Sequence, residues 1–315
     1  MQAVPQLLDH LREQTGKVIV GQQEFRNHCL ITLLCRGHAL LEGVPGVAKT
    51  LLVKTLSRIL GLGFQRVQCT SDLMPADIIG TNVLNVATST FDLHQGPVFT
   101  DFLLVDEINR MPPRTQAALL ECMEEYQVTI DGTRHQLPAE FSVFATQNPI
   151  EFEGTYPLPE AQLDRFLLKI RVAYPNADDE VQILANVQNG LEARELDSMG
   201  LQVLAAGLLA QAQQEVKSVR VEPALFKYIV QIARRTRDWP ALSLGASPRA
   251  AISMMVVARA IAAMDARDYI IPDDVKEAAP AVLRHRVVLK PEADLEGLTA
   301  DVIIADVLRA VEVPK

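Results

Sequence analysis

One stretch near the N-terminus decides the fold of this chain. A short apolar run, His38-Ala39-Leu40-Leu41-Glu42, leads into a glycine-rich turn, and a helical pattern then extends from Lys49 to Leu60. The turn and the first residues of the helix read Gly43-Val44-Pro45-Gly46-Val47-Ala48-Lys49-Thr50-Leu51. Where a loop follows a strand and opens a helix, backbone N–H groups and the helix N-terminus converge and favour an anion. The stretch therefore predicts a phosphate-binding P-loop whose residues contact a nucleotide.

Two residues of this stretch carry the expected chemistry. The Lys49 ammonium can reach the β- and γ-phosphates of ATP, and the Thr50 hydroxyl can ligate Mg²⁺. The full pattern has glycine before the lysine, whereas this chain has Ala48. A methyl group fits there only if the backbone has helix-like dihedral angles, so we expect such angles at Ala48. Taken alone, the stretch is also compatible with a plain glycine turn between a strand and a helix.

A second motif places two carboxylates at the end of a buried strand. The run Phe102-Leu103-Leu104-Val105 is wholly apolar, as in a strand covered on both faces, and Asp106 and Glu107 follow it. Asp106 can hold Mg²⁺ through water, and Glu107 can polarise the attacking water. A solvated Asp-Glu pair at a strand end is the alternative. The apolar strand, one α/β span after Lys49, favours a catalytic pair.

A third motif ends the following strand. The segment Phe144-Ala145-Thr146-Gln147-Asn148-Pro149 places Asn148 where its amide can orient the water beside the γ-phosphate. An Asn-Pro pair alone is only a turn signal. Its position after a P-loop and an Asp-Glu strand favours the functional interpretation.

The pattern along the chain predicts a parallel α/β sheet followed by a helical domain. Helical patterns separate most of the apolar runs, which is typical of parallel sheets. The further strands are expected at residues 67–70, 102–106, 142–146 and 167–172. Tyr174-Pro175-Asn176 marks a boundary, and only helical periodicity follows it. We therefore expect a nucleotide-binding domain at residues 1–175 and a helical domain at 176–315.

The first domain has additional features. Helices are expected from Pro5 to Leu34, with a break at residues 18–22. Two segments read as hairpins, one at residues 81–93 and one at 128–137, where an Asp-Gly pair separates two alternating segments.

Together these motifs resemble the MoxR family of AAA+ ATPases. Leu163-Asp164-Arg165-Phe166 and Gly245-Ala246-Ser247-Pro248-Arg249-Ala250 complete the resemblance, which runs from about Val18 to Arg286. The family shares the alanine before the P-loop lysine. The resemblance implies an α/β P-loop NTPase core of the AAA+ type, with a C-terminal all-helical lid domain.

The resemblance also implies roles for residues outside the three motifs. Arg165 would be an arginine finger that reaches the γ-phosphate bound by a neighbouring subunit, although the residue alone reads as a salt-bridged surface arginine. Arg249 resembles the sensor-2 arginine that contacts ATP from the lid. Val20, Gly21 and Gln22 resemble the segment beside the adenine.

Other parts of the chain have weaker assignments. The two hairpins resemble insertions that face a central pore or a client protein. Arg110 and Arg134 are weaker candidates for contacts between subunits. His285 approaches the nucleotide from the lid or belongs to a cluster on a helix surface. Trp239 is interpreted as lid core or interface packing.

The function expected from the resemblance is Mg²⁺-dependent hydrolysis of ATP by a ring of subunits, usually a hexamer. Such a motor would act as a chaperone that remodels or matures protein complexes, with a von Willebrand factor A domain protein as one kind of partner. A motor acting on nucleic acid and a nucleotide switch without hydrolysis are the alternatives. Glu107, Asn148 and Arg165 together argue against the switch.

The net charge and composition of the chain bear on its partners and its location. The 315 residues carry a formal charge of −9, which disfavours a large surface for duplex nucleic acid. The four cysteines form no metal-binding pattern and are expected to be reduced thiols. We expect no membrane span and a cytoplasmic location, because no apolar stretch is long enough and no secretory pattern begins the chain.

Overall fold

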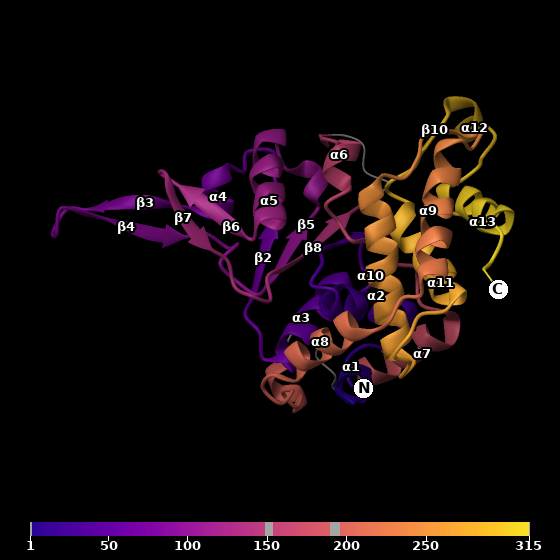
Figure 1. The fold of residues 1–315 in the computed structure, drawn as a ribbon. Helices are drawn as coiled ribbons and strands as arrows, with labels where there is room; N and C mark the ends of the chain where they lie inside the picture. Colours follow the sequence, from indigo (N-terminus) through magenta and orange to yellow (C-terminus); the bar gives the residue numbers. More distant parts are fainter. Residues whose placement is uncertain (1, 149–153, 190–195, 315) are drawn as a thin grey trace.

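The centre of the protein is a five-stranded parallel sheet with the order β2-β5-β8-β1-β9 (Figure 1). The computed structural model describes residues 2–148, 154–189 and 196–314. The strands of the sheet are β1 (Ala39–Glu42), β2 (Phe64–Gln68), β5 (Phe102–Asp106), β8 (Ser142–Gln147) and β9 (Leu168–Arg171). The predicted parallel α/β sheet is confirmed, although β2 begins earlier than residue 67.

Both faces of this sheet are buried, which explains the wholly apolar run in β5. Leu104 belongs to a hydrophobic cluster on one face, whereas Leu103 and Val105 belong to a second cluster on the other face. The first cluster includes α1 (Ala3–Gly16), α2 (Gln23–Leu34) and α3 (Lys49–Leu60), and the second includes α5 (Pro113–Glu125). The expected break between the first two helices is confirmed. Short helical segments also occur at α4 (Pro75–Ile79), η1 (Ile108–Arg110) and α6 (Glu160–Leu163).

Two antiparallel hairpins leave the core where they were predicted. They are β3 (Gly80–Asn85) with β4 (Thr90–Gln95), and β6 (Gln127–Ile130) with β7 (Thr133–Gln136). The second hairpin turns at Asp131 and Gly132, which both have positive φ, as a two-residue hairpin turn requires. Figure 1 shows β3 and β4 extending far from the sheet, on the side opposite the C-terminal helices.

The described residues of the C-terminal part are helical apart from one small sheet. Its helices are α7 (Ala177–Gln188), η2 (Leu196–Met199), α8 (Leu208–Ser218), α9 (Pro223–Arg237), α10 (Pro248–Met264), α11 (Pro272–Leu283), α12 (Pro291–Leu295) and α13 (Ala300–Ala310). The small sheet pairs β10 (Leu242–Leu244) with β11 (Val288–Leu289). The expectation of helices alone missed this pair, because strands of two or three residues leave no readable period.

The lid helices and the N-terminal helices share one hydrophobic cluster. The Glu215 carboxylate of α8 accepts hydrogen bonds from the backbone N–H groups of Gln2, Ala3 and Val4, and so caps the start of α1. A division of the chain at residue 175 stays a prediction. In the part of the chain that is described, no helix has both the length and the apolar character needed to cross a membrane.

Candidate active site

The predicted phosphate loop lies between β1 and α3, as the sequence indicates. The N-terminus of α3 begins at Lys49, has no side-chain cap, and has no acidic residue in its first turn. An uncapped helix start leaves backbone N–H groups and a partial positive charge available to an anion. Close packing fixes the start of the loop, because a Cβ at Gly43 would lie 2.6 Å from the carbonyl oxygen of Val172. The loop therefore has the geometry of an anion site.

The conformation of Ala48 differs from the expectation. Its φ is 62° and its ψ is 21°, which is left-handed backbone and not the helix-like backbone expected of a residue at a helix start. Alanine rarely adopts this conformation, because Cβ approaches the following carbonyl oxygen. The chain therefore holds in a strained form the backbone that glycine would adopt freely.

The Lys49 side chain turns back over the loop. Its ammonium donates hydrogen bonds to the carbonyl oxygens of Gly43, at 2.5 Å, and Val44, at 3.2 Å. Burial lowers the pKa of Lys49, while the carboxylates of Asp106 and Glu107 oppose that shift. The ammonium is thus held between the loop and the two acidic residues.

The two carboxylates lie at the carboxyl end of β5 and are held by the neighbouring strands. Asp106 is buried; its Oδ1 accepts a hydrogen bond from the Thr146 hydroxyl at 3.0 Å, and its Oδ2 lies 2.7 Å from Arg66 Nε. The Glu107 backbone N–H donates to the same hydroxyl at 2.9 Å. Glu107 has a φ of 59° and forms an ion pair with Arg110 at 2.9 Å. Arg110 therefore has a partner beside the site within its own chain.

One polar pocket of about 450 Å³ collects these groups. It is lined by Pro45, Gly46, Ala48, Lys49, Thr50, Leu51, Arg66, Gln68, Asp106, Glu107, Thr146 and Asn148. The predicted residues Lys49, Thr50, Asp106, Glu107 and Asn148 are thus brought together. Pro149, which follows Asn148 in the sequence motif, lies outside the described residues.

Sequence reasoning missed Arg66, Gln68 and Thr146. Gln68 ends β2 and Thr146 stands one residue before the end of β8, at the edge where ligands bind in parallel sheets, whereas Arg66 lies in the middle of β2. Thr146 stands two residues before Asn148 and was quoted in that motif without a role. Arg66 is one of three polar residues in β2, and a polar residue in a strand does not by itself distinguish a ligand contact from a solvated side chain.

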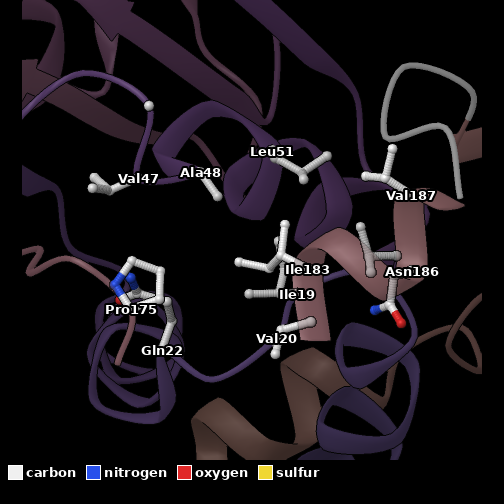
Figure 2. A pocket seen from close by; sticks show the side chains of 12 residues that line it. Ile19, Val20, Gln22, Val47, Ala48, Leu51, Pro175, Ile183, Asn186 and Val187 are labelled. Carbon is white, nitrogen blue, oxygen red and sulfur yellow. The ribbon is translucent and has the colours of Figure 1, made fainter. Parts of the chain in front are cut away.

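A second pocket of about 160 Å³ opens beside the loop and shares Gly46, Ala48 and Leu51 with the polar pocket. Its lining is mostly apolar: Val18, Ile19, Val20, Gln22, Gly46, Val47, Ala48, Leu51, Pro175, Ile183, Asn186 and Val187. Figure 2 shows side chains from Ile19, Ala48 and Ile183 converging on one space. An apolar slot joined to a phosphate loop suits the flat base of a nucleotide.

The expected adenine-side segment belongs to this second pocket. Val20 and Gln22 line it, whereas Gly21 acts through backbone geometry. Gly21 has a φ of 63°, and a Cβ there would lie 2.1 Å from Asp179 Oδ2 of α7. The sequence did not reveal the contribution of α7, although Ile183 and Val187 are spaced for one helix face.

Arg165 and Arg249 do not line either nucleotide pocket. Both contact the Glu124 carboxylate, Arg165 through Nε at 2.8 Å and Arg249 through Nη1 at 3.1 Å. The hydrogen bond from Arg165 is the main cause of the lowered pKa of Glu124. The two predicted arginines are therefore brought together by one carboxylate, at a place distant from Lys49.

This arginine pair lies at the amino edge of the sheet. The N–H of Leu167 donates to the carbonyl of His38, which directly precedes β1, and His38 Nε2 lies 2.9 Å from the carbonyl oxygen of Met123, the neighbour of Glu124. The phosphate loop leaves the opposite, carboxyl end of β1. Four residues of strand separate the two edges by about 13 Å. In this structure the arginine pair and the phosphate loop of the same chain thus lie at opposite edges of the sheet.

His285 is neither beside the nucleotide pockets nor on a helix surface. It is buried, and its Nε2 lies 3.0 Å from the carbonyl oxygen of Phe166. Burial holds the pKa of His285 well below its usual range, and the charge of Arg286 lowers it further. Both expectations for His285 are thus wrong, because the segment after α11 (Pro272–Leu283) packs against residues 164–167.

The remaining candidates have ordinary surroundings. Arg134 is exposed on β7. Trp239 packs against the hydrophobic cluster of the lid, with the guanidinium of Arg235 over its ring at 5.4 Å. All four cysteines are free thiols. Among the described residues no three His, Cys, Asp or Glu side chains form a metal cluster.

Comparison with known proteins identifies the relatives of this chain. Residues 38–168 match the ATPase family associated with various cellular activities (AAA), and residues 234–307 match the AAA lid domain. YeaC from Bacillus subtilis is 44% identical over 98% of this chain and 95% of its own length. Chaperone MoxR1 from Mycobacterium tuberculosis is 44% identical over 96% of this chain and 81% of its own length. A crystal structure from Cytophaga hutchinsonii superposes with a TM-score of 0.90 at 41% identity, covering 99% of this chain and 96% of that one.

Proposed function

The chain belongs to the MoxR family of AAA+ ATPases, and from that premise we propose that it hydrolyses ATP with Mg²⁺ as a motor that remodels or matures protein complexes. One observation carries the proposal. Lys49, Thr50, Asp106, Glu107 and Asn148 line a single pocket, which adjoins an apolar slot for the base. This combination supports in-line attack of water on the γ-phosphate.

The donor set of the pocket fits Mg²⁺. The metal prefers oxygen ligands and is usually held by one or two side chains together with the phosphates of the nucleotide. The Thr50 hydroxyl and the Asp106 carboxylate are such ligands, and both line the pocket. When bound, Mg²⁺ neutralises charge on the phosphates. Arg66 must then share or release Asp106 Oδ2, which it contacts in this structure.

Residues of the chain itself bind the phosphates and position the attacking water. Lys49 and the start of α3 bind the phosphates, and Glu107 orients and polarises the attacking water. Thr146 fixes the Glu107 backbone and the Asp106 side chain at once, which holds the two carboxylates in register. The Asn148 amide positions the water from the next strand.

We assign Arg165 and Arg249 to the nucleotide of a second copy. Each copy presents a phosphate pocket on one edge of the sheet and the arginine pair on the opposite edge. A head-to-tail contact between such unlike edges generates a ring when its rotation closes. A hexamer is the ring that we propose.

The protein client and the partner remain part of this proposal. The protruding β3–β4 hairpin exposes Val83, Leu84, Val86 and Phe91, which supports contact with another polypeptide. A von Willebrand factor A domain protein is the partner that the family suggests. A cytoplasmic location stays a prediction of the sequence. Stimulation of turnover by DNA would instead support the nucleic-acid motor, and ATP binding without turnover would support the switch.

Steady-state ATP turnover across protein concentrations tests the proposal, with native protein, Glu107→Gln and Arg165→Ala compared. Specific activity should rise with concentration in the native protein and fall by about 10³-fold in Arg165→Ala, because an arginine finger supplies that order of rate. Glu107→Gln should bind ATP and lose turnover. Activity that is flat with concentration and indifferent to Arg165 would mean that each copy hydrolyses ATP alone.

A further inference from the structure

The lid holds the backbone of the finger segment, residues 164–167. The Arg286 guanidinium donates hydrogen bonds to the carbonyl oxygens of Asp164 at 3.2 Å, Phe166 at 2.7 Å and Leu167 at 3.1 Å. Its side chain is only 2% exposed. Three backbone carbonyl groups around Arg165 are thus held by one planar side chain with a rigid donor geometry, which lies three residues after the lid helix α11.

The same guanidinium binds the Asp164 carboxylate. Arg286 Nε lies 2.6 Å from Asp164 Oδ1, and Asp164 Oδ2 accepts a hydrogen bond from the Ser247 hydroxyl at 3.1 Å. Ser247 is the N-cap of α10, and Arg249 stands in the first turn of that helix. Asp164 therefore connects the backbone next to Arg165 with the helix start that carries Arg249.

Both the side chains and the backbone of the arginine pair are therefore held in place. Glu124 holds the two side chains, and the ion pair of the partly buried Asp164 with the buried Arg286 holds the two backbones. Phe166, which follows Arg165, is fully buried, and its carbonyl oxygen also accepts from the buried His285 ring. Such networks add little net stability relative to an apolar core, but they specify one arrangement of the groups they join.

We propose that the Asp164–Arg286 ion pair is a positioning device of the lid, which holds Arg165 and Arg249 as one unit for the phosphates bound by the next copy. The inference rests on the shared site proposed above. Asp164 and Arg286 touch no nucleotide and act only through the two arginines. A lid that moves in one copy then moves the arginines that serve its neighbour.

Mixing of variant copies tests this role. Asp164→Asn removes the charge of the pair and keeps the shape of the side chain, and we expect turnover to fall on the order of 10²-fold, as for a displacement of about 1 Å in a catalytic group. Binding of a fluorescent ATP analogue should stay close to the native value, because the pocket lies at the other edge. Arg286→Lys, which keeps charge and loses the planar fork, should have the same defect.

The decisive experiment mixes Asp164→Asn with Glu107→Gln in equal amounts. The Asp164→Asn copy has an intact pocket, and the Glu107→Gln copy supplies intact arginines. Turnover should therefore recover above that of either variant, up to about a quarter of the native value, since a quarter of the contacts in a random ring pair these two copies in the productive order.

A parallel mixture of Arg165→Ala with Glu107→Gln separates the two proposals. Recovery there without recovery for Asp164→Asn would overturn the positioning role and leave the shared site intact. No recovery in either mixture would overturn the shared site and this inference with it. Loss of ATP-analogue binding in both Asp164→Asn and Arg286→Lys would also overturn it, because the pair would then support the fold as a whole.

Discussion

Replacing Ala48 with glycine tests the geometry of the phosphate loop most directly. Ala48 has left-handed backbone, with φ 62° and ψ 21°, immediately before α3. We expect Ala48→Gly to stabilise the folded chain, although glycine weakens most helices. The expected sign follows from the backbone conformation alone, because the substitution removes one methyl group and no hydrogen bond.

The expected change in the free energy of unfolding is the difference of two opposing effects. Left-handed backbone costs a residue with a Cβ about 1–2 kcal/mol, and this strain disappears with glycine. Glycine also gains freedom in the unfolded chain, which costs about 0.4–1 kcal/mol on folding. The net stabilisation is therefore about 0.5–1 kcal/mol, which corresponds to a rise in the thermal midpoint of roughly 1–4 °C.

Two matched variants make the thermal measurement decisive. Ala266 is exposed in the lid, far from the loop, and has a φ of 57°, so Ala266→Gly should also stabilise. Ala210 is exposed within α8 and right-handed, so Ala210→Gly should destabilise by about 1 kcal/mol. The reasoning is refuted if Ala48→Gly lowers the midpoint as much as Ala210→Gly does.

Three further predictions concern the arginine pair, the base pocket and a buried histidine. Arg249→Ala should lower ATP turnover as strongly as Arg165→Ala, and the double variant should be little worse than either, because the two act as a unit. Val187→Asp should raise the Kd of an ATP analogue by roughly tenfold, since it places a charge in the lining of the apolar slot, where a bound base would take it out of water. Burial lowers the pKa of His38 to about 4. As the pH falls, His38 therefore takes up a proton below about pH 6.5 in the unfolded chain but only near pH 4 in the folded chain. This contribution to the free energy of unfolding is complete above pH 6.5 and is lost as the pH falls to 4.

Each of these predictions has a control within the chain. Arg309→Ala removes an exposed arginine on α13 and should leave turnover unchanged. Val181→Asp lies on α7 at an exposed position outside the slot and should leave the Kd unchanged. His38→Gln should flatten the pH dependence of denaturant unfolding between pH 4 and 6.5. Equal effects of Val181→Asp and Val187→Asp on the Kd would contradict the assignment of the slot to the base.

The chemistry of the phosphate pocket could be predicted from the sequence because it is local. A strand that is apolar on both sides must be buried on both faces, so the polar residues that end it must lie at the sheet edge. Asp106, Glu107 and Asn148 were placed by this argument, and they line the pocket with Lys49. The order of the motifs along the chain then placed these residues near Lys49, since parallel strands bring their carboxyl ends to one edge.

The backbone conformation of the loop could not be predicted in the same way. Helix-like angles at Ala48 were inferred from what a methyl group prefers. The turn between β1 and α3 instead requires positive φ, and the packing around it outweighs the local preference of one residue. The slot beside the loop was missed in part for a related reason. Whether Ile183 and Val187 face solvent or a ligand depends on where α7 packs, and a helix period does not contain that information.

By itself, the sequence determined the sheet, the loop and the residues that end the strands at the polar pocket, because spacing along a strand or helix fixes which groups share an edge. Only the tertiary structure decided where Arg165 and Arg249 lie. Their meeting at Glu124, and their attachment to the lid through Asp164 and Arg286, join segments that are up to 125 residues apart. Contacts of that separation arise from the packing of whole helices against the sheet, which leaves no period or motif in the chain.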